Sequence, residues 1–291
     1  GNYEQEFASQ KEILFAPLRE TSARIKDKEF IKRLFNHNGL SVTALNNYLN
    51  CPWHYFYTNL LRVPHAPTKH QMYGTAVHGA LRDFFEARKN EDPAKEMLIQ
   101  KFEHYLNQQP LISSEYQESL EKGRRALSGY YDAYHELWAH TVLCEFNITG
   151  ILLTPDIRIT GKIDKIEIID PATNGVNVVD YKTAKPKTRG EIEGSTKNSE
   201  GDIKRQLVFY KLLLDRYDNG KFKMISGDID FIEPDDKGRY KKERLIIAPE
   251  DVVELEALIK KVADEILSLS FWDKTCDNEE CRYCNLRKMM L

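Results

Sequence analysis

The chain has 291 residues, of which 41% are hydrophobic and 30% are charged. This length suffices for one large core, or for one core with an added subdomain. The sequence contains no apolar run of about 18 residues and no secretory signal pattern, so we expect a cytoplasmic protein without a membrane partner. The formal net charge of −3 is unusual for a nucleic-acid-binding protein, so contact with DNA would require local basic patches or a partner domain.

The first segment, residues 1–36, is charged and weakly amphipathic, which predicts one or two helices leading in from an upstream region. We expect the domain proper to span 37–291. It opens with a helix capped by Ser41 or Thr43, and Pro52 is expected to close this helix. The aromatic run that follows, 53–57, is better explained by a place in the core than by base stacking.

The middle of the chain changes from a helical to a strand-like period. Three helices are predicted first, over 74–88, 95–108 and 115–140. Alternating apolar residues then predict four strands, over 142–148, 157–159, 161–169 and 176–180. Between the last two strands, residues 170–175 form a typical turn sequence, Asp-Pro-Ala-Thr-Asn-Gly.

The remaining third of the chain alternates helices and strands. A polar loop is predicted over 185–201, helices over 202–217 and 249–270, strands over 224–232 and 244–247, and then a cysteine-bearing tail. Helices followed by a strand-rich centre and a helix between strands predict an α/β fold, a mixed sheet flanked by helices.

The hairpin about the 170–175 turn carries two acids and a lysine. If the loop centres on Ala172, Asp164 lies opposite Asp180 with Cβ atoms roughly 5 Å apart. Lys182 is two residues further along the strand and points to the same side as Asp180. Two facing carboxylates destabilise a sheet unless a cation lies between them.

A hard divalent ion such as Mg²⁺ or Mn²⁺ meets that need, because it binds carboxylate oxygens and keeps water for a substrate phosphate. The ion can generate hydroxide, and Lys182 can orient or activate that water or pair with the phosphate. The pattern therefore predicts phosphodiester cleavage. The alternative is that both acids lie at exposed strand ends, or that a one-residue register slip separates them.

The stretch Gly161-Lys162-Ile163-Asp164, followed after the turn by Val178-Val179-Asp180-Tyr181-Lys182-Thr183, resembles the core of RecB-type PD-(D/E)xK nucleases. Related domains occur at the C-terminus of RecB, AddB and some UvrD-like helicases. The resemblance implies a restriction-endonuclease-like sheet with helical additions. It also implies that Asp164 and Asp180 are the two acids and Lys182 the catalytic lysine.

Flanking motifs extend the resemblance over about residues 40–284. The start of the 74–88 helix resembles the family's Gly-x-x-x-His motif, which implies that His78 is a metal ligand beside the two acids. On its own, a helix histidine is more often a packing residue. Gln206 and Tyr210 resemble the family's Gln-x-x-x-Tyr helix, which approaches the scissile strand, and they share one helix face. Glu145 is a further candidate acid.

Four cysteines form a separate group: Cys51, Cys276, Cys281 and Cys284. Four thiolates hold either an iron–sulfur cluster or Zn²⁺. In iron–sulfur members of the resembled family one cysteine follows the opening helix and three lie at the C-terminus, which implies a 4Fe–4S cluster. The tail departs from that pattern, because the extra cysteine precedes the closely spaced pair, so zinc remains the alternative. Cys144 is expected to be a small core residue.

Basic residues near the hairpin could neutralise phosphates: Lys182, Lys185, Lys187, Arg189, Lys204 and Arg205, with a second group at Lys241, Lys242 and Arg244. The sequence has no P-loop, so the resemblance implies helicase domains of the same polypeptide as partners, acting on DNA in repair or recombination. The alternatives are a catalytically silent module that binds DNA or clamps a helicase, and a nuclease that acts on RNA.

Overall fold

The computed structural model describes residues 26–197 and 199–290. The chain divides into two compact units. Among the described residues, the larger unit comprises 40–42, 64–197 and 199–259, and the smaller unit comprises 26–39, 43–63 and 260–290. Among the described helices, none combines the length and the apolar character needed to cross a membrane. The predicted lead-in before Lys26 lies outside the described residues.

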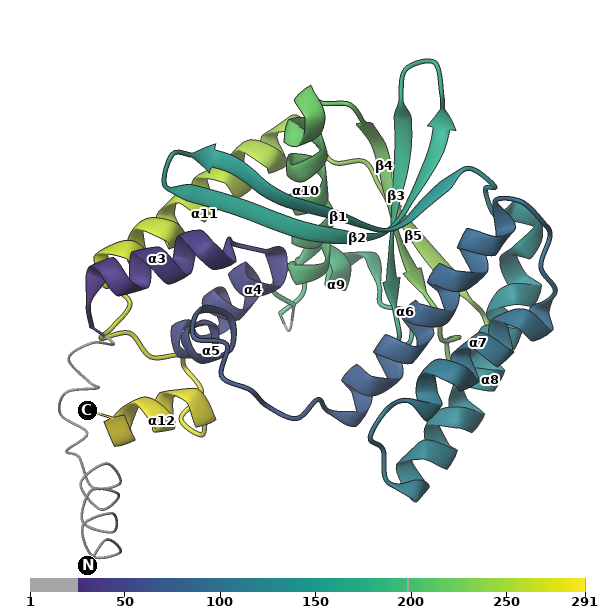
Figure 1. Ribbon diagram of the computed structural model, residues 1–291, viewed down its shortest axis with the longest axis horizontal. Coiled ribbons are helices and arrows are strands. Elements are labelled where there is room, and N and C mark those ends of the chain that lie inside the picture. Colours follow the sequence, from purple (N-terminus) through teal and green to yellow (C-terminus); the bar gives the residue numbers. More distant parts are fainter. Residues whose placement is uncertain (1–25, 198, 291) are drawn as a thin grey trace, which may run out of the picture. The chain divides into compact units, whose positions relative to one another are not determined.

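A five-stranded sheet forms the centre of the larger unit (Figure 1), in the order β1-β2-β3-β4-β5. Its strands are β1 (Val142–Thr154), β2 (Ile157–Asp170), β3 (Gly175–Lys182), β4 (Lys223–Phe231) and β5 (Lys241–Leu245). The pair β3 and β4 is parallel, while the other neighbours are antiparallel. The predicted mixed α/β sheet is therefore confirmed.

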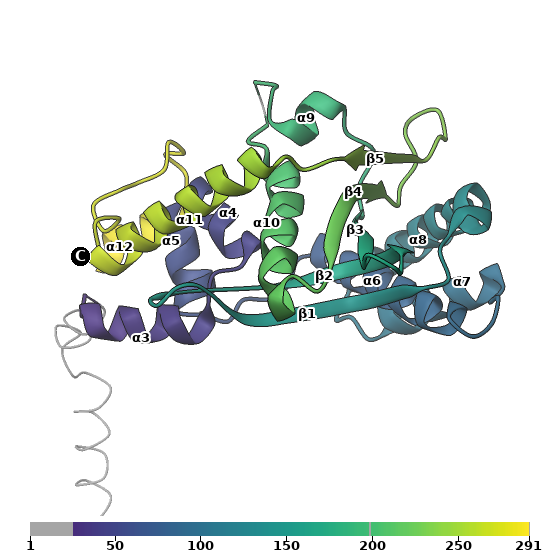
Figure 2. The same cartoon turned by 90° about the horizontal axis from the view of Figure 1, so that it is seen from above.

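Helices cover both sides of this sheet (Figure 2). Consecutive residues of a strand point to opposite faces. In β3, Tyr181 packs in the core that α6 (Lys69–Arg88) helps to form, whereas Asp180 contacts Tyr210 of α10 (Asp202–Arg216). Since β3 has a helix on each face, seven of its eight residues are buried, as the burial pattern of a covered parallel strand requires.

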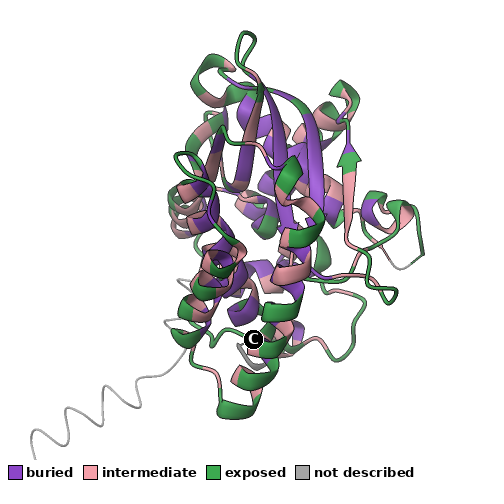
Figure 3. Cartoon of the chain, turned by 90° about the vertical axis from the view of Figure 1, so that its right-hand side faces the viewer, coloured by how far each residue is buried: buried purple, intermediate pink, exposed green. Residues whose placement is uncertain are grey.

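The α6 helix begins earlier than predicted. Thr68 and Gln71 form a capping box, so the helix starts at Lys69 and Gly74 lies inside it. Its apolar face, which includes Val77, Leu81 and Phe84, packs with α7 (Lys95–Asn107) and α8 (Ser113–Tyr134). Colouring by burial shows buried residues in the interior of the larger unit (Figure 3), and β3 and β4 are buried along most of their length.

Three further boundaries differ from the sequence prediction. The two short strands predicted on either side of Thr160 are one strand, β2, because its pairing with β1 continues from Ile159 to Gly161 across a register shift. The predicted 185–201 loop contains the short helix α9 (Arg189–Glu193), whose capping box of Thr188 and Glu191 was its sequence signal. The opening helix α4 ends at Asn50, just before Pro52 as expected, but Pro52 also begins a new helix, because the first helical turn needs no N–H donor there.

The smaller unit consists of helices: α3 (Lys28–Asn38), most of α4 (Val42–Asn50), α5 (Pro52–Tyr55), a π-helical turn (Phe56–Leu60), the end of α11 (Pro249–Ser268) and α12 (Arg282–Met290). Its core is aromatic. Trp53, Phe56 and Phe271 are fully buried and stack edge-on or tilted against one another. The expected core role of the 53–57 run is confirmed. The Trp53 indole also donates a hydrogen bond to the Lys274 carbonyl, which fastens the C-terminal segment to this core.

Candidate active site

The β2–β3 hairpin brings the two predicted acids together. Its pairing includes Lys165 opposite Val179 and Ile166 opposite Val178, which is the register expected for a loop centred on Ala172. The regular ladder ends there. One step further, the Asp164 side chain accepts a hydrogen bond from the Tyr181 backbone N–H at 2.9 Å, in place of a ladder bond. Asp164 is therefore fixed by backbone at the point where the two strands part.

Asp180 and Lys182 form a connected chain with the α10 helix. The Lys182 Nζ lies 2.8 Å from Asp180 Oδ2 and donates to Gln206 Oε1 at 2.6 Å. Gln206 in turn donates to the Tyr210 hydroxyl at 2.7 Å, and that hydroxyl donates to Asp180 Oδ1 at 3.2 Å. The i, i+4 spacing of Gln206 and Tyr210 closes this ring, so all four side chains fix one another.

His78, Glu145 and Asp164 form a second group next to this ring. Each residue offers one ligand atom, and the three atoms lie within 4.8 Å of one another. His78 Nδ1 is 3.3 Å from Asp164 Oδ1, while its ring meets Tyr181 edge-on. Two of the three predicted metal ligands, His78 and Asp164, therefore lie together with Glu145. The third, Asp180, contacts Lys182 instead.

Glu145 has a strained backbone. It lies between the β1–β2 pairs Cys144–Lys165 and Phe146–Ile163, which sets it across from Asp164. Its φ of 51° is in the left-handed region, which a residue with a Cβ enters at a cost of about 1–2 kcal/mol. Its carboxylate also pairs with Lys162. Such strain is found where a function requires it, and here it turns a carboxylate toward Asp164.

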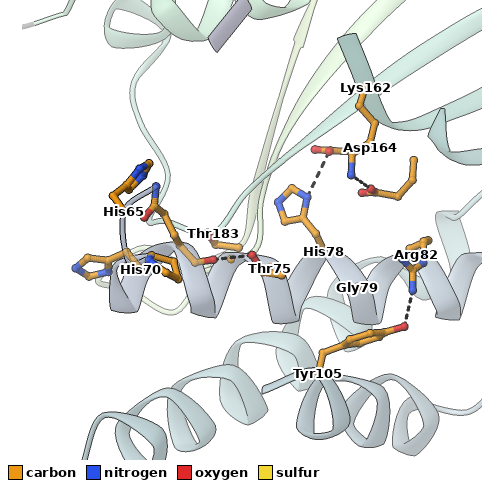
Figure 4. Close-up of a pocket in the computed structure, with 14 residues that line it drawn as sticks. His65, His70, Thr75, His78, Gly79, Arg82, Tyr105, Lys162, Asp164 and Thr183 are labelled. Atoms are coloured by element: carbon orange, nitrogen blue, oxygen red, sulfur yellow. Dashed lines mark hydrogen bonds and ion pairs between the residues drawn. The ribbon is translucent and has the colours of Figure 1, made fainter. Parts of the chain in front are cut away.

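A pocket of about 820 Å³ opens onto this second group (Figure 4). His78 projects from α6 toward Asp164, and Lys162 lies on the same side. The rim carries further polar side chains that the sequence did not single out: His65, His70, Thr75, Arg82, Tyr105 and Thr183. Gly74 faces Thr183, and a Cβ at Gly79 would meet the Tyr105 ring at 2.8 Å, so glycine there lets α7 approach α6 closely.

The charged groups of the site shift one another's pKa values. Burial raises the pKa of Asp180, and the nearby charge of Asp164 adds to this, although Lys182 opposes both. Burial acts on Asp164 in the same sense, but its hydrogen bond and charge interaction with His78 hold its pKa below the ordinary value. For His78, burial is outweighed by the hydrogen bond and charge of Asp164, which raise its pKa. The two acids therefore compete for the nearby positive charge.

The donors fit a hard divalent cation. Glu145 and Asp164 supply carboxylate oxygens and His78 an imidazole nitrogen, a set suited to Mg²⁺ or Mn²⁺. Asp180 Oδ2 is buried and accepts no hydrogen bond, although the Lys182 ammonium lies nearby. An under-coordinated carboxylate oxygen beside this group is a further donor that a cation can use.

The four predicted cysteines also converge, within the smaller unit. Cys51 Sγ lies 3.6 Å from Cys284 Sγ and 3.7 Å from Cys281 Sγ. Cys276 Sγ lies 3.7 Å from Cys284 Sγ. All are free thiols, and all four sulfurs lie within 4.8 Å of one another, so this group can hold a metal. Cys144 lies in β1 and packs against the core around α6, as expected for a small core residue.

Most of the basic residues expected to meet phosphates have acidic partners. Lys242 pairs with the buried Asp230, and Arg244 binds both oxygens of the buried Asp228. Others in the two groups form more exposed pairs: Lys185 with Asp236, Arg189 with Glu193, Lys204 with Asp251, and Lys241 with Glu243. The second basic group is therefore largely structural.

The sequence matches the family described as the PD-(D/E)XK nuclease superfamily over residues 39–289. No curated protein sequence matches it. Among solved structures, it is similar to a protein from Eubacterium rectale provisionally named an exonuclease, with 11% identity, a TM-score of 0.51, and coverage of 88% of this chain and 90% of the other. A second solved structure, SSO0001, has 15% identity and a TM-score of 0.33, with coverage of 83% of this chain and 89% of the other.

Proposed function

The chain belongs to the PD-(D/E)XK nuclease superfamily, and from this premise we propose that it hydrolyses DNA phosphodiesters with Mg²⁺ or Mn²⁺. One observation carries the proposal: two acids at the end of a strand ladder, one buried and one partly buried, are linked to a lysine, a histidine and the Gln206–Tyr210 pair. A structural role does not require two acids to be held beside each other against their mutual repulsion.

Each residue has a role in this proposal. His78, Glu145 and Asp164 bind the ion, with Asp180 as a further carboxylate donor. When bound, the ion activates water and stabilises charge on the phosphate. Lys182 is positioned by Gln206 and Asp180 to donate to the attacking water or to a phosphate oxygen. Tyr210 holds the Asp180 carboxylate in place, so that Gln206 and Tyr210 act as positioning residues.

We propose further that residues 37–291 are the nuclease domain of a cytoplasmic helicase–nuclease in DNA repair or recombination. The family match over 39–289 supports the boundary, and the exonuclease name of the Eubacterium rectale protein supports the type of reaction. The net charge of −3 and the pairing of most basic residues support a substrate delivered by a partner, with helicase domains of the same polypeptide as the candidate partner.

The first experiment measures cleavage of end-labelled single- and double-stranded DNA, and of matched RNA, with Mg²⁺, Mn²⁺ or EDTA. Lys182→Ala should reduce cleavage by roughly 10²–10⁴-fold, because it removes the ammonium proposed to activate the water or to bind the phosphate. Lys221→Ala is the matched control, since half of that side chain is exposed and its ion pair with Asp218 lies outside the candidate site.

Cleavage that requires both the metal and Lys182 would establish the nuclease, and the preferred strand would identify its substrate. Full activity of Lys182→Ala would overturn the assignment. Absence of cleavage by the folded wild-type chain, combined with DNA binding, would favour the catalytically silent module.

A further inference from the structure

The four cysteines come from two distant segments of the smaller unit. Cys51 precedes the first turn of α5, Cys276 and Cys281 lie between α11 and α12, and Cys284 lies in the first turn of α12. Between Thr275 and Arg282 no residue is buried, and most of this segment has no regular structure. Hydrophobic packing of this segment therefore does not explain why the sulfurs of Cys276 and Cys281 lie within 4.8 Å of the Cys51 sulfur. A bound metal does, because metal binding supplies folding free energy to segments that lack a core.

The sulfur–sulfur distances identify the kind of metal centre. In a regular tetrahedron with Zn–S bonds of about 2.3 Å, the sulfurs lie about 3.8 Å apart. In a 4Fe–4S cluster each thiolate binds a different iron, which separates the sulfurs by roughly 6 Å. The observed separations are 3.6 Å for Cys51–Cys284 and 3.7 Å for both Cys51–Cys281 and Cys276–Cys284, and no separation in the group exceeds 4.8 Å.

We propose that Cys51, Cys276, Cys281 and Cys284 bind one tetrahedral Zn²⁺ ion and not an iron–sulfur cluster. The group leaves no space for four irons and four sulfides between the thiols. Four thiolates close the coordination shell, which is the pattern of a structural zinc site with no open position for a substrate. The site would fasten the C-terminal segment to the α5 region, and this inference does not depend on the proposed nuclease activity.

The test measures the metal content of the full chain, prepared both in air and without oxygen. Because the His78 group can also retain zinc, the protein carries His78→Ala and is dialysed against EDTA long enough to clear weak sites. We expect about one zinc per chain and no stoichiometric iron or sulfide. Replacement by Co²⁺ should give the visible absorption of a tetrahedral thiolate site. Roughly four irons and four sulfides per chain in the oxygen-free preparation would overturn the proposal.

Variants assign the zinc to these thiols. Cys281→Ser should lose most of the bound zinc and lower the Tm by roughly 5 °C or more, whereas Cys144→Ser, which alters a cysteine outside the group, should keep the zinc. If Cys281→Ser does not fold, Cys276→Ser provides the same comparison at a second thiol of the group. Zinc content unchanged in the cysteine variants, or no metal bound by wild-type thiols, would also refute the proposal.

Discussion

Two groups of buried and partly buried acids occupy the same sheet, and they differ in how their charge is balanced. In the first, which we call the paired cluster, each acid has its own permanent cation: Glu167 with Lys165, Asp228 with Arg244, and Asp230 with Lys242. In the candidate site, Asp180 forms an ion pair with Lys182, and Glu145 forms one with Lys162. The partner of Asp164 is the His78 imidazole, which is charged only when it is protonated.

This difference in charge balance distinguishes a group of acids that stabilises the fold from a group that can bind a ligand. Buried acids with a full set of lysines and arginines are satisfied without any ligand, and Asn177 adds hydrogen bonds to Glu167 and Asp228. The candidate site lacks one permanent positive charge, and its His78 and Lys182 side chains remain 28% and 27% exposed toward solvent. A divalent cation would supply the missing charge. Three tests, from the largest expected effect to the smallest, probe this contrast.

Asp180→Asn should have the largest effect, on activity and not on stability. Cleavage should fall by roughly 10²–10⁴-fold, because the site loses a carboxylate next to the ion. In EDTA the free energy of unfolding should stay the same or rise by up to about 2 kcal/mol, since burial and Asp164 disfavour the charged form of Asp180. Urea unfolding measures this, and a clear destabilisation would show that Asp180 is part of a balanced structural pair.

Lys165→Met should have the opposite result, with a loss of about 3–5 kcal/mol of stability, because Glu167 is left buried without its cation. Burial opposes ionisation, but the charge of Lys165 holds the pKa of Glu167 below its ordinary value. The pair therefore stabilises the fold above the unfolded-state pKa of a glutamate, and this contribution disappears as pH falls through the lower folded-state value.

Urea unfolding as a function of pH tests this expectation. The stability difference between wild type and Lys165→Met should shrink as the pH falls through that range. Equal stability of the two proteins at neutral pH would mean that the paired cluster is not structural.

Glu145→Gly should have the smallest effect on stability, with a gain of up to about 1 kcal/mol, because glycine adopts a φ of 51° without strain. Glu145→Ala is the matched control, since it removes the carboxylate but keeps the strain. Both should cut DNA about 10–100-fold more slowly at limiting metal. Cleavage by both at the wild-type rate would remove Glu145 from the metal site.

The sequence was most informative where local patterns determine geometry. The Asp-Pro-Ala-Thr-Asn-Gly turn and the alternating strands beside it predict the register that joins Asp164 to Asp180. The two-residue period of a strand predicts that Lys182 lies on the same side as Asp180. The period of a helix predicts that Gln206 and Tyr210 share one face. The three helices before the sheet were predicted correctly in number because their apolar spacing is regular.

The position of Glu145 could not be predicted because it depends on irregularities. Two register shifts interrupt the β1–β2 ladder between its turn and the site, and Gly150 has a φ of 75° beside one of them. Without these shifts Glu145 would lie across from Ile166 instead of Asp164. The paired cluster was missed for another reason: Lys165 and Asp230 look like surface residues in a sequence, and only tertiary packing buries them.

The parallel pairing of β3 with β4 has a consequence for synthesis on the ribosome. Parallel neighbours require a crossover, and here residues 183–222 carry it, with α10 inside. A nascent chain ending before Asp202 contains Asp164, Asp180 and Lys182, but it lacks the helix that anchors the lysine. The reactive groups therefore reach their final arrangement only after a long loop has closed, late in translation.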